Sequence, residues 1–355
     1  MKKKQERQSN FELLRILCTI AIISDHFVGQ SGIADGSFFT TAAVSLSRVS
    51  CSVFVILSAW FSAESAFHSK QLFHIWLTAF FWQVGISFVL WLRGSVPASV
   101  FRSALFPLEE SGLWFASYFS VLLLFSPLLK ALVRREKRLT EWILLVLAVL
   151  MVGYSTLSGS LGFFASEIWP LIFVYVLTLY LRLYLPEPPR PGTAAIVFGL
   201  SWAALTGLRF FAARRGLPLL AAYGELYRAR LQTLPNLLLA FSLFFAFRGV
   251  RIPQSRWINR VASCSLGVYA IHQTPLWYPL LWEKVFFAPV HAALLQGGMR
   301  KLYVVAAVLT VEAVGTVLEL LRSGLMGLLI EKRSWFLRFC DKLDRFVENR
   351  ESVTL

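Results

Sequence analysis

Runs of about 20 apolar residues, separated by short polar segments, recur along the whole chain. A helical run of this length spans the ~30 Å hydrocarbon core of a bilayer. The pattern therefore predicts an all-α fold, a polytopic membrane helical bundle of about ten transmembrane helices. The ten expected spans are, in chain order, 11–29, 43–63, 71–92, 112–132, 141–160, 163–184, 193–211, 231–248, 262–286 and 302–330.

The polar segments divide the chain into three parts. Residues 1–10 form a basic N-terminal tail, 11–330 the ten-span domain, and 331–355 a tail that mixes aromatic and basic residues. Basic segments stand at the N-terminus, after every even-numbered span and at the C-terminus, so the positive-inside rule places both termini in the cytoplasm. The apolar residues of the last part recur at helical intervals, which predicts an amphipathic helix on the inner leaflet.

Composition supports a membrane protein and excludes other classes. Hydrophobic residues make up 57% of the chain and charged residues only 15%, against roughly 25% charged in soluble domains; the mean hydropathy is +0.62. The net charge of +15 is explained by basic residues that set topology and meet anionic lipid, so the expected partner is the lipid bilayer, with no nucleic acid. The four cysteines lack the spacing of a metal site, and no phosphate-binding glycine motif occurs.

One connection departs from the charge pattern. The segment between the seventh and eighth spans should face outward, yet it carries five arginines, namely Arg209, Arg214, Arg215, Arg228 and Arg230. Two interpretations are open. The segment is either local variation in a long loop or a basic rim for an anionic substrate on the outer side.

The first span carries four ionisable residues, Glu12, Arg15, Asp25 and His26. At about 100° and 1.5 Å per residue, Arg15 and His26 share one face and lie about 16 Å apart along the axis, whereas Asp25 points about 100° away from His26. An ionised group at mid-membrane costs at least ~2.5–3.5 kcal/mol, so such residues usually face a cavity or a partner. The alternatives are a structural Arg15–Glu12 ion pair or a site with Arg15 in the inner half and His26 in the outer half.

Other polar residues in the apolar segments are candidates for the same site. Ser265, Tyr269 and His272 occupy positions i, i+4 and i+7 of one helical stripe, which suits either a polar seam between helices or a substrate-site lining. Arg48 opens the second span near the outer face, where it either snorkels or holds a substrate. Trp114 suits an aromatic interface belt or the site.

Near the end of the chain, Glu312 and Glu319 lie seven residues apart on one face of the last span, with Arg322 three residues further on. This spacing predicts an internal ion pair. The pattern suggests no role for Glu167.

Two early sequence blocks resemble the acyltransferase 3 family, multi-span membrane acyltransferases that modify extracytoplasmic glycans. NFELLRILCTIAIISDHF resembles the family's first span, in which an Arg and a His are separated by ten residues; Arg15 and His26 match this spacing. SLSRVSCSVFVILSAWF resembles the second span, with Arg48 and Ser58 in register. The second block departs from the family at Ala59 and at other positions.

Two later blocks follow in the family's order, so the resemblance covers nearly the whole chain. GLWFASYFSVLLLFSPLL resembles the fourth span through Trp114 and Pro127, and SLGVYAIHQTPLW resembles a late span through its serine, tyrosine and histidine. The Arg-x-x-Arg pattern of the family near the start of the third span is not kept, because KQLFHIW stands there. If the family pattern contacts the acyl donor, this departure changes the affinity for the donor or the identity of the donor.

The resemblance implies an integral membrane O-acyltransferase of the cell inner (plasma) membrane. It implies transfer of an acetyl or other short acyl group from cytoplasmic acyl-CoA to a hydroxyl of an exported or lipid-linked saccharide. No tightly bound cofactor is expected, and acetyl-CoA or another acyl-CoA is the co-substrate. His26 is the expected general base, Arg15 the donor-binding residue and Glu12 the support of Arg15. The expected substrate-binding residues are Arg48, Ser58, Trp114, Ser265, Tyr269 and His272.

Two other functions are open. A transporter or flippase for a glycan or a lipid-linked precursor would use the same charged cavity without covalent chemistry, although no internal repeat supports it. The second open function is that of a non-catalytic membrane scaffold or sensor derived from the family.

Overall fold

The computed structural model describes residues 8–108, 112–159, 164–275 and 277–353. Within these ranges all regular secondary structure is helical, which confirms the all-α class. Most of the predicted tail 1–10 and the junction of the fifth and sixth expected spans lie outside the described residues.

The helices follow the apolar runs of the sequence. The first half of the chain forms α1 (Ser9–Gln30), α2 (Phe38–Ala43), α3 (Ser47–Ser62), α4 (Ser69–Leu92), α5 (Ala98–Ser103), α6 (Trp114–Arg135), α7 (Lys137–Leu147), the π-helix η1 (Ala148–Gly153), α8 (Tyr154–Ser158) and α9 (Ile168–Tyr184). The second half forms α10 (Pro191–Arg214), α11 (Pro218–Ala229), α12 (Leu234–Arg248), α13 (Arg256–Ala262), α14 (Ser265–Gln273), α15 (Tyr278–Leu280), η3 (Leu281–Val285), α16 (Ala288–Leu294), α17 (Gly297–Met326), η4 (Gly327–Glu331) and α18 (Ser334–Val353).

Six helical segments in the described part of the chain are long and apolar enough to cross a membrane, and the bent pair α11 and α12 makes a seventh if it is one span. The six are 38–62, 69–92, 114–135, 137–158, 191–214 and 297–331. Helix α1 is not among them and carries four ionisable side chains, while α9 has only 17 residues. The predicted count of ten spans is therefore not confirmed.

The expected ninth span, 262–286, is not one helix. It is divided into α13, α14, α15 and η3. Thr274 adopts φ −56° and ψ 124° at the end of α14. The next residue is Pro275, and the ring of a proline disfavours helical geometry in the residue before it. The Thr-Pro pair therefore ends α14 directly after His272 and Gln273.

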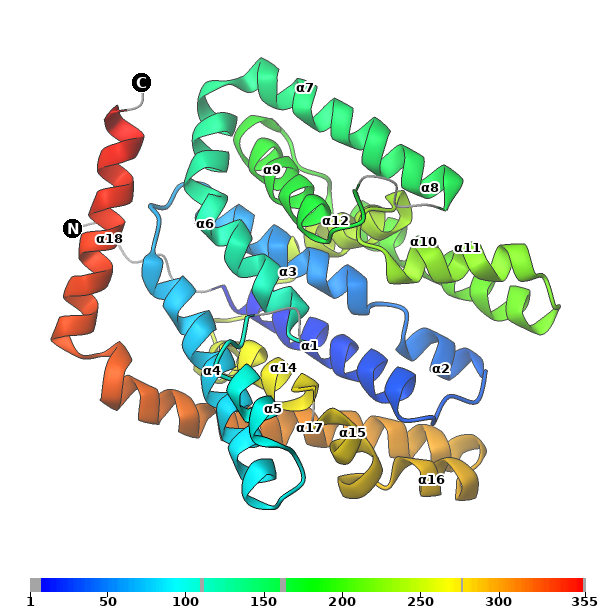
Figure 1. The fold of residues 1–355 in the computed structure, drawn as a ribbon. Helices are drawn as coiled ribbons and strands as arrows, with labels where there is room; N and C mark the ends of the chain where they lie inside the picture. Colours follow the sequence, from blue (N-terminus) through cyan, green and yellow to red (C-terminus); the bar gives the residue numbers. More distant parts are fainter. Residues whose placement is uncertain (1–7, 109–111, 160–163, 276, 354–355) are drawn as a thin grey trace.

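Helix α1 runs through the middle of the molecule and packs against α3, α12, α13, α14 and α17 (Figure 1). Its buried residues are shared between two apolar clusters. Phe11, Leu14 and Cys18 belong to the larger cluster, with residues of α3, α6, α9 and α12. Ile23 and Phe27 belong to the smaller one, with residues of α14, η3 and α17. Because α1 packs against both apolar clusters, its ionisable residues are held in fixed orientations.

Helix α14 approaches α17 closely around a buried ion pair. Arg322 donates hydrogen bonds to Glu319 at 2.8 and 2.6 Å, and Trp82 of α4 donates to the same carboxylate at 2.8 Å. A Cβ on Gly267 of α14 would lie 2.0 Å from Oε2 of Glu319. The predicted internal ion pair is present between Glu319 and Arg322, and it joins α4, α14 and α17.

The C-terminal helix α18, red in Figure 1, lies beside α4 and α6. Phe336 and Cys340 are buried, and Phe73 of α4 meets the rings of Phe336 and Phe339. Asp344 accepts a hydrogen bond of 2.7 Å from the backbone N–H of Ser69, the first residue of α4. One face of the predicted amphipathic helix is thus covered by protein.

Candidate active site

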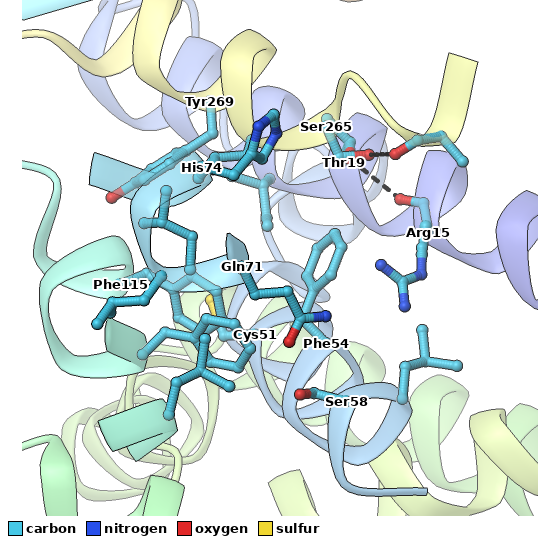
Figure 2. A pocket seen from close by; sticks show the side chains of 18 of the residues that line it. Arg15, Thr19, Cys51, Phe54, Ser58, Gln71, His74, Phe115, Ser265 and Tyr269 are labelled. Carbon is cyan, nitrogen blue, oxygen red and sulfur yellow. Dashed lines mark hydrogen bonds between the residues drawn. The ribbon is translucent and has the colours of Figure 1, made fainter. Parts of the chain in front are cut away.

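A cavity of about 1270 Å³ lies beside α1, between α3, α4, α6 and α14, with α18 at one end. Its volume exceeds the ~300–1,000 Å³ of ordinary small-molecule sites. The lining mixes apolar side chains with polar and charged ones. Figure 2 shows Arg15 of α1, Ser58 of α3 and Gln71 of α4 pointing toward the same space.

The cavity follows α1 for most of its length. The lining residues of this helix run from Glu12 to Gln30, and 18 steps of about 1.5 Å make about 27 Å. This is close to the ~30 Å thickness of the hydrocarbon core. Arg15 and His26 both line the cavity, so one connected space reaches both side chains.

The Arg15 end of the cavity is rich in polar groups. The Nε atom of Arg15 lies 3.8 Å from Glu12 Oε2. Lys130 of α6 is buried, lines the same cavity and donates to the Ser65 carbonyl at 3.2 Å. Buried cations such as Lys130 bind anionic ligands through charge-assisted hydrogen bonds.

The departure from the family pattern at the start of α4 falls on this same end. Lys70, Gln71 and His74 all line the cavity. Lys70 donates to the Glu331 carbonyl at 3.3 Å, and His74 Nδ1 lies 3.0 Å from the Glu331 carboxylate. Lys70 and His74, two of the residues that replace the Arg-x-x-Arg pattern, therefore contact η4, which lies between α17 and α18.

At the far end, Arg48 is fixed by two contacts. Its Nη1 lies 3.2 Å from Glu167 Oε1, and its guanidinium lies 4.4 Å from the centre of the Trp114 ring. Burial raises the pKa of the Glu167 carboxyl, and the nearby guanidinium groups of Arg48 and Arg230 oppose that rise. Arg48 is thus held at the cavity wall by Glu167 and Trp114.

Two of the five arginines of the predicted basic connection, Arg209 and Arg228, have acidic partners. Arg228 Nη1 lies 3.1 Å from Asp25 Oδ1, and its Nε lies 2.8 Å from Glu225. Arg209 also pairs with Glu225. Arg228 lines the cavity, but its charge and that of Arg209 are matched by carboxylates. These contacts give Asp25 a partner and weaken the interpretation of a bare basic rim.

His26 has a partner on α14. Its Nδ1 atom lies 2.9 Å from Nε2 of His272, and His272 Nδ1 lies 2.6 Å from the carbonyl oxygen of Val268. His272 is fully buried and does not line the cavity. Ser265 and Tyr269 of the same stripe do line it, and the Tyr269 hydroxyl donates to the Gly112 carbonyl at 3.2 Å.

Most side chains predicted from the sequence share this one cavity. The lining residues among them are Glu12, Arg15, His26, Arg48, Ser58, Trp114, Ser265 and Tyr269. His272 is the exception: it contacts His26 but does not line the cavity. The sequence analysis missed Lys130, and it missed that Glu167 pairs with Arg48 and that Arg228 pairs with Asp25. A lysine inside the apolar run of α6 was a usable signal for Lys130, whereas the two partners depend on tertiary contacts.

The fold and the cavity define the class of protein: an all-α chain with several membrane-length helices that enclose a large polar and apolar cavity. A family model described as an acyltransferase domain matches residues 8–314. The chain therefore belongs to the acyltransferase 3 family, which confirms the resemblance of the four sequence blocks. The comparisons with curated proteins and with solved structures give no match.

Proposed function

We propose that this protein transfers an acetyl or other short acyl group from cytoplasmic acyl-CoA to a hydroxyl of an exported or lipid-linked saccharide. The observation that carries the proposal is one connected cavity along α1, which reaches Arg15 near one end and His26 near the other. A donor and an acceptor entering from opposite sides of the membrane would meet in such a space. Membership of an acyltransferase family supports the same reaction type.

In this reaction His26 is the general base. The acceptor hydroxyl oxygen attacks the thioester carbonyl carbon while the imidazole of His26 takes the hydroxyl proton. The tetrahedral intermediate then collapses, the carbon–sulfur bond breaks, and His26 returns the proton to the departing thiolate. The products are a saccharide ester and free coenzyme A. In this proposed reaction Arg48 counters the developing oxyanion.

Arg15 is the proposed donor-binding residue, supported by Glu12. The phosphates of an acyl-CoA are dianionic or monoanionic groups that bind cations through charge-assisted hydrogen bonds. Lys70 and Lys130 line the same end of the cavity and add positive charge there. The proposed substrate-binding residues that line the cavity are Ser58, Trp114, Ser265 and Tyr269.

The test is acyl-CoA turnover by purified protein in nanodiscs with an extracted saccharide pool, followed by release of free thiol. We expect His26→Ala to abolish turnover, since general-base removal typically costs ~10²–10⁴-fold. Arg15→Gln should raise the KM for acyl-CoA. The control is His291→Ala, because His291 does not line the cavity and lies on α16.

Each result has a distinct meaning. Turnover that survives in folded His26→Ala rejects the role of His26 and retains the enzyme. Absence of turnover in the folded wild type, across several acyl-CoAs and saccharide pools, rejects the enzyme and favours transport of a glycan or lipid-linked precursor.

A further inference from the structure

His26 and His272 form a hydrogen-bonded pair whose proton positions follow from their third partner. The carbonyl oxygen of Val268 can only accept a hydrogen bond. His272 Nδ1, 2.6 Å away, must therefore carry a proton. If the His272 ring is neutral, its Nε2 has no proton and can only accept.

The surroundings of His272 keep its ring neutral. The side chain is fully buried and belongs to a region lined by Trp282, Tyr269 and other apolar or aromatic groups. Among the described residues, no carboxylate is hydrogen-bonded to it. Burying an imidazolium without a charged partner is strongly unfavourable. The neutral ring therefore presents the lone pair of Nε2 toward Nδ1 of His26, 2.9 Å away.

The proton between the two rings then belongs to His26. With Nδ1 protonated, the neutral imidazole of His26 has its lone pair on Nε2. This is the ring nitrogen that a substrate in the cavity can use, since Nδ1 is occupied by His272. Asp25, the adjacent carboxylate, does not take the place of His272 as the partner of His26, because it is paired with Arg228.

We infer that His272 is a positioning residue: it holds His26 in the Nδ1–H tautomer and so places the basic lone pair on Nε2 at the cavity. The inference rests on the proposed function, because tautomer control matters only if His26 accepts a proton. A triad carboxylate also sets the tautomer of its histidine. Here a neutral imidazole, anchored on a backbone carbonyl, sets the tautomer without adding a negative charge.

The pair also fits the proton transfer. When Nε2 of His26 takes the acceptor's proton, the imidazolium keeps its Nδ1–H bond to His272 Nε2. The same bond therefore serves both protonation states, and the ring does not need to rotate between accepting and returning the proton. This fixed orientation is the physical gain from the pair.

The direct test uses ¹⁵N-histidine protein in lipid and solid-state NMR of the wild type. The chain has five histidines, so His26→Gln and His272→Gln spectra assign the pair by difference. We expect a protonated Nδ1 and an unprotonated Nε2 on His26, with a coupling across the hydrogen bond to His272. A His26 ring protonated on Nε2 alone would overturn the inference, whatever the turnover.

Two substitutions test the consequence for the reaction. His272→Leu removes the acceptor, and we expect kcat to fall by about tenfold or more while the KM for acyl-CoA changes little. His272→Gln keeps an acceptor oxygen near the position of Nε2 and should recover most of kcat. A folded His272→Leu protein with full kcat contradicts the inference.

The readouts separate this inference from the proposed function. The NMR result needs no turnover. If the tautomer is as expected but no acyl transfer occurs with any donor, the proposed function fails and the pair stands as a structural feature. If acyl transfer occurs and His26 has the other tautomer, the function stands and the role of His272 is wrong.

Discussion

At the scale of single residues, the most demanding electrostatic feature is the ion pair of Arg322 and Glu319. Both side chains are almost completely excluded from solvent. Desolvation of two charges is offset only by good geometry and further hydrogen bonds, which Trp82 supplies on the Glu319 side. The arrangement makes the two charges dependent on each other.

Glu319→Gln should therefore destabilise the protein strongly. The substitution keeps the shape and the hydrogen bond from Trp82 but leaves a buried, unpaired guanidinium, for which about 3–5 kcal/mol is expected. The measurement is the free energy of unfolding in mixed micelles. Glu141→Gln is the matched control, because Lys137 and Glu141 are exposed and 3.9 Å apart; it should cost less than about 1 kcal/mol. Equal effects of the two substitutions would contradict the argument.

Helix geometry alone was sufficient to predict that Arg15 and His26 face the same side. It was not sufficient to find the partner of His26. His272 stands 246 residues away, and periodicity within α14 indicates only that Ser265, Tyr269 and His272 share a stripe. Which member of the stripe faces the cavity and which meets α1 depends on the rotation of α14 against its neighbours.

At the scale of helices, the packing of α14 against α17 depends on Gly267. A methyl group at this position would meet the Glu319 carboxylate at 2.0 Å, so either this side chain leaves its hydrogen bonds with Arg322 and Trp82 or one helix moves. The bend of the chain at Thr274 and Pro275 leaves α14 only nine residues long. A shift of Gly267 therefore moves the whole of this short helix.

We expect Gly267→Ala to destabilise the protein by about 1–3 kcal/mol, as overpacking usually does. Gly85→Ala on α4 is the control, since nothing lies within 4 Å of the position of its Cβ. Alanine is the better helix former by about 1 kcal/mol, so this control should be neutral or stabilising. Thermal unfolding of both variants in the same detergent is the measurement. Similar unfolding temperatures would show that α14 and α17 separate easily.

Helix α18 docks on α4 partly through Asp344, whose carboxylate caps the N-terminus of α4. Asp344 accepts from the backbone N–H of Ser69, where the partial positive charge at the N-terminus of α4 favours an anion. Asp344→Ala should therefore speed hydrogen exchange of the first amides of α4 and loosen α18.

Asp341→Ala is the matched control, because Asp341 lies three residues earlier on the same helix and also lines the cavity. Its substitution should leave exchange at Ser69 unchanged. Exchange that is equally fast in the two variants would mean that the charge of α18 matters and the cap does not.

At the scale of the whole molecule, the sequence predicted the helical class and the family, and it placed nearly every apolar run on a helix. The count of ten full-length spans is not confirmed, because hydropathy alone does not register breaks in a helix. Pro275 interrupts the run from 262 to 286, and α12 has only 15 residues. Such segments are apolar through burial against other helices and need not cross the bilayer by themselves.

The predicted orientation can be tested with two exposed positions on either side of α10. In a cysteine-free background, Glu187→Cys stands before this helix and Arg215→Cys directly after it. The positive-inside rule expects an impermeant maleimide to label Arg215→Cys from outside intact cells and Glu187→Cys only in inverted vesicles. The reverse pattern would invert the orientation, and labelling of both from one side would remove α10 as a span.

The pairing of the cavity arginines with carboxylates has a consequence for how long ligands stay. Arg15, Arg48 and Arg228 have Glu12, Glu167 and Asp25 beside them, so an incoming anion must displace a resident acid. Competition of this kind lowers the apparent affinity by the fraction of time that each guanidinium is engaged. The same carboxylates take over again as the ligand leaves, which shortens its residence. A cavity arranged in this way favours rapid exchange of its contents over tight retention.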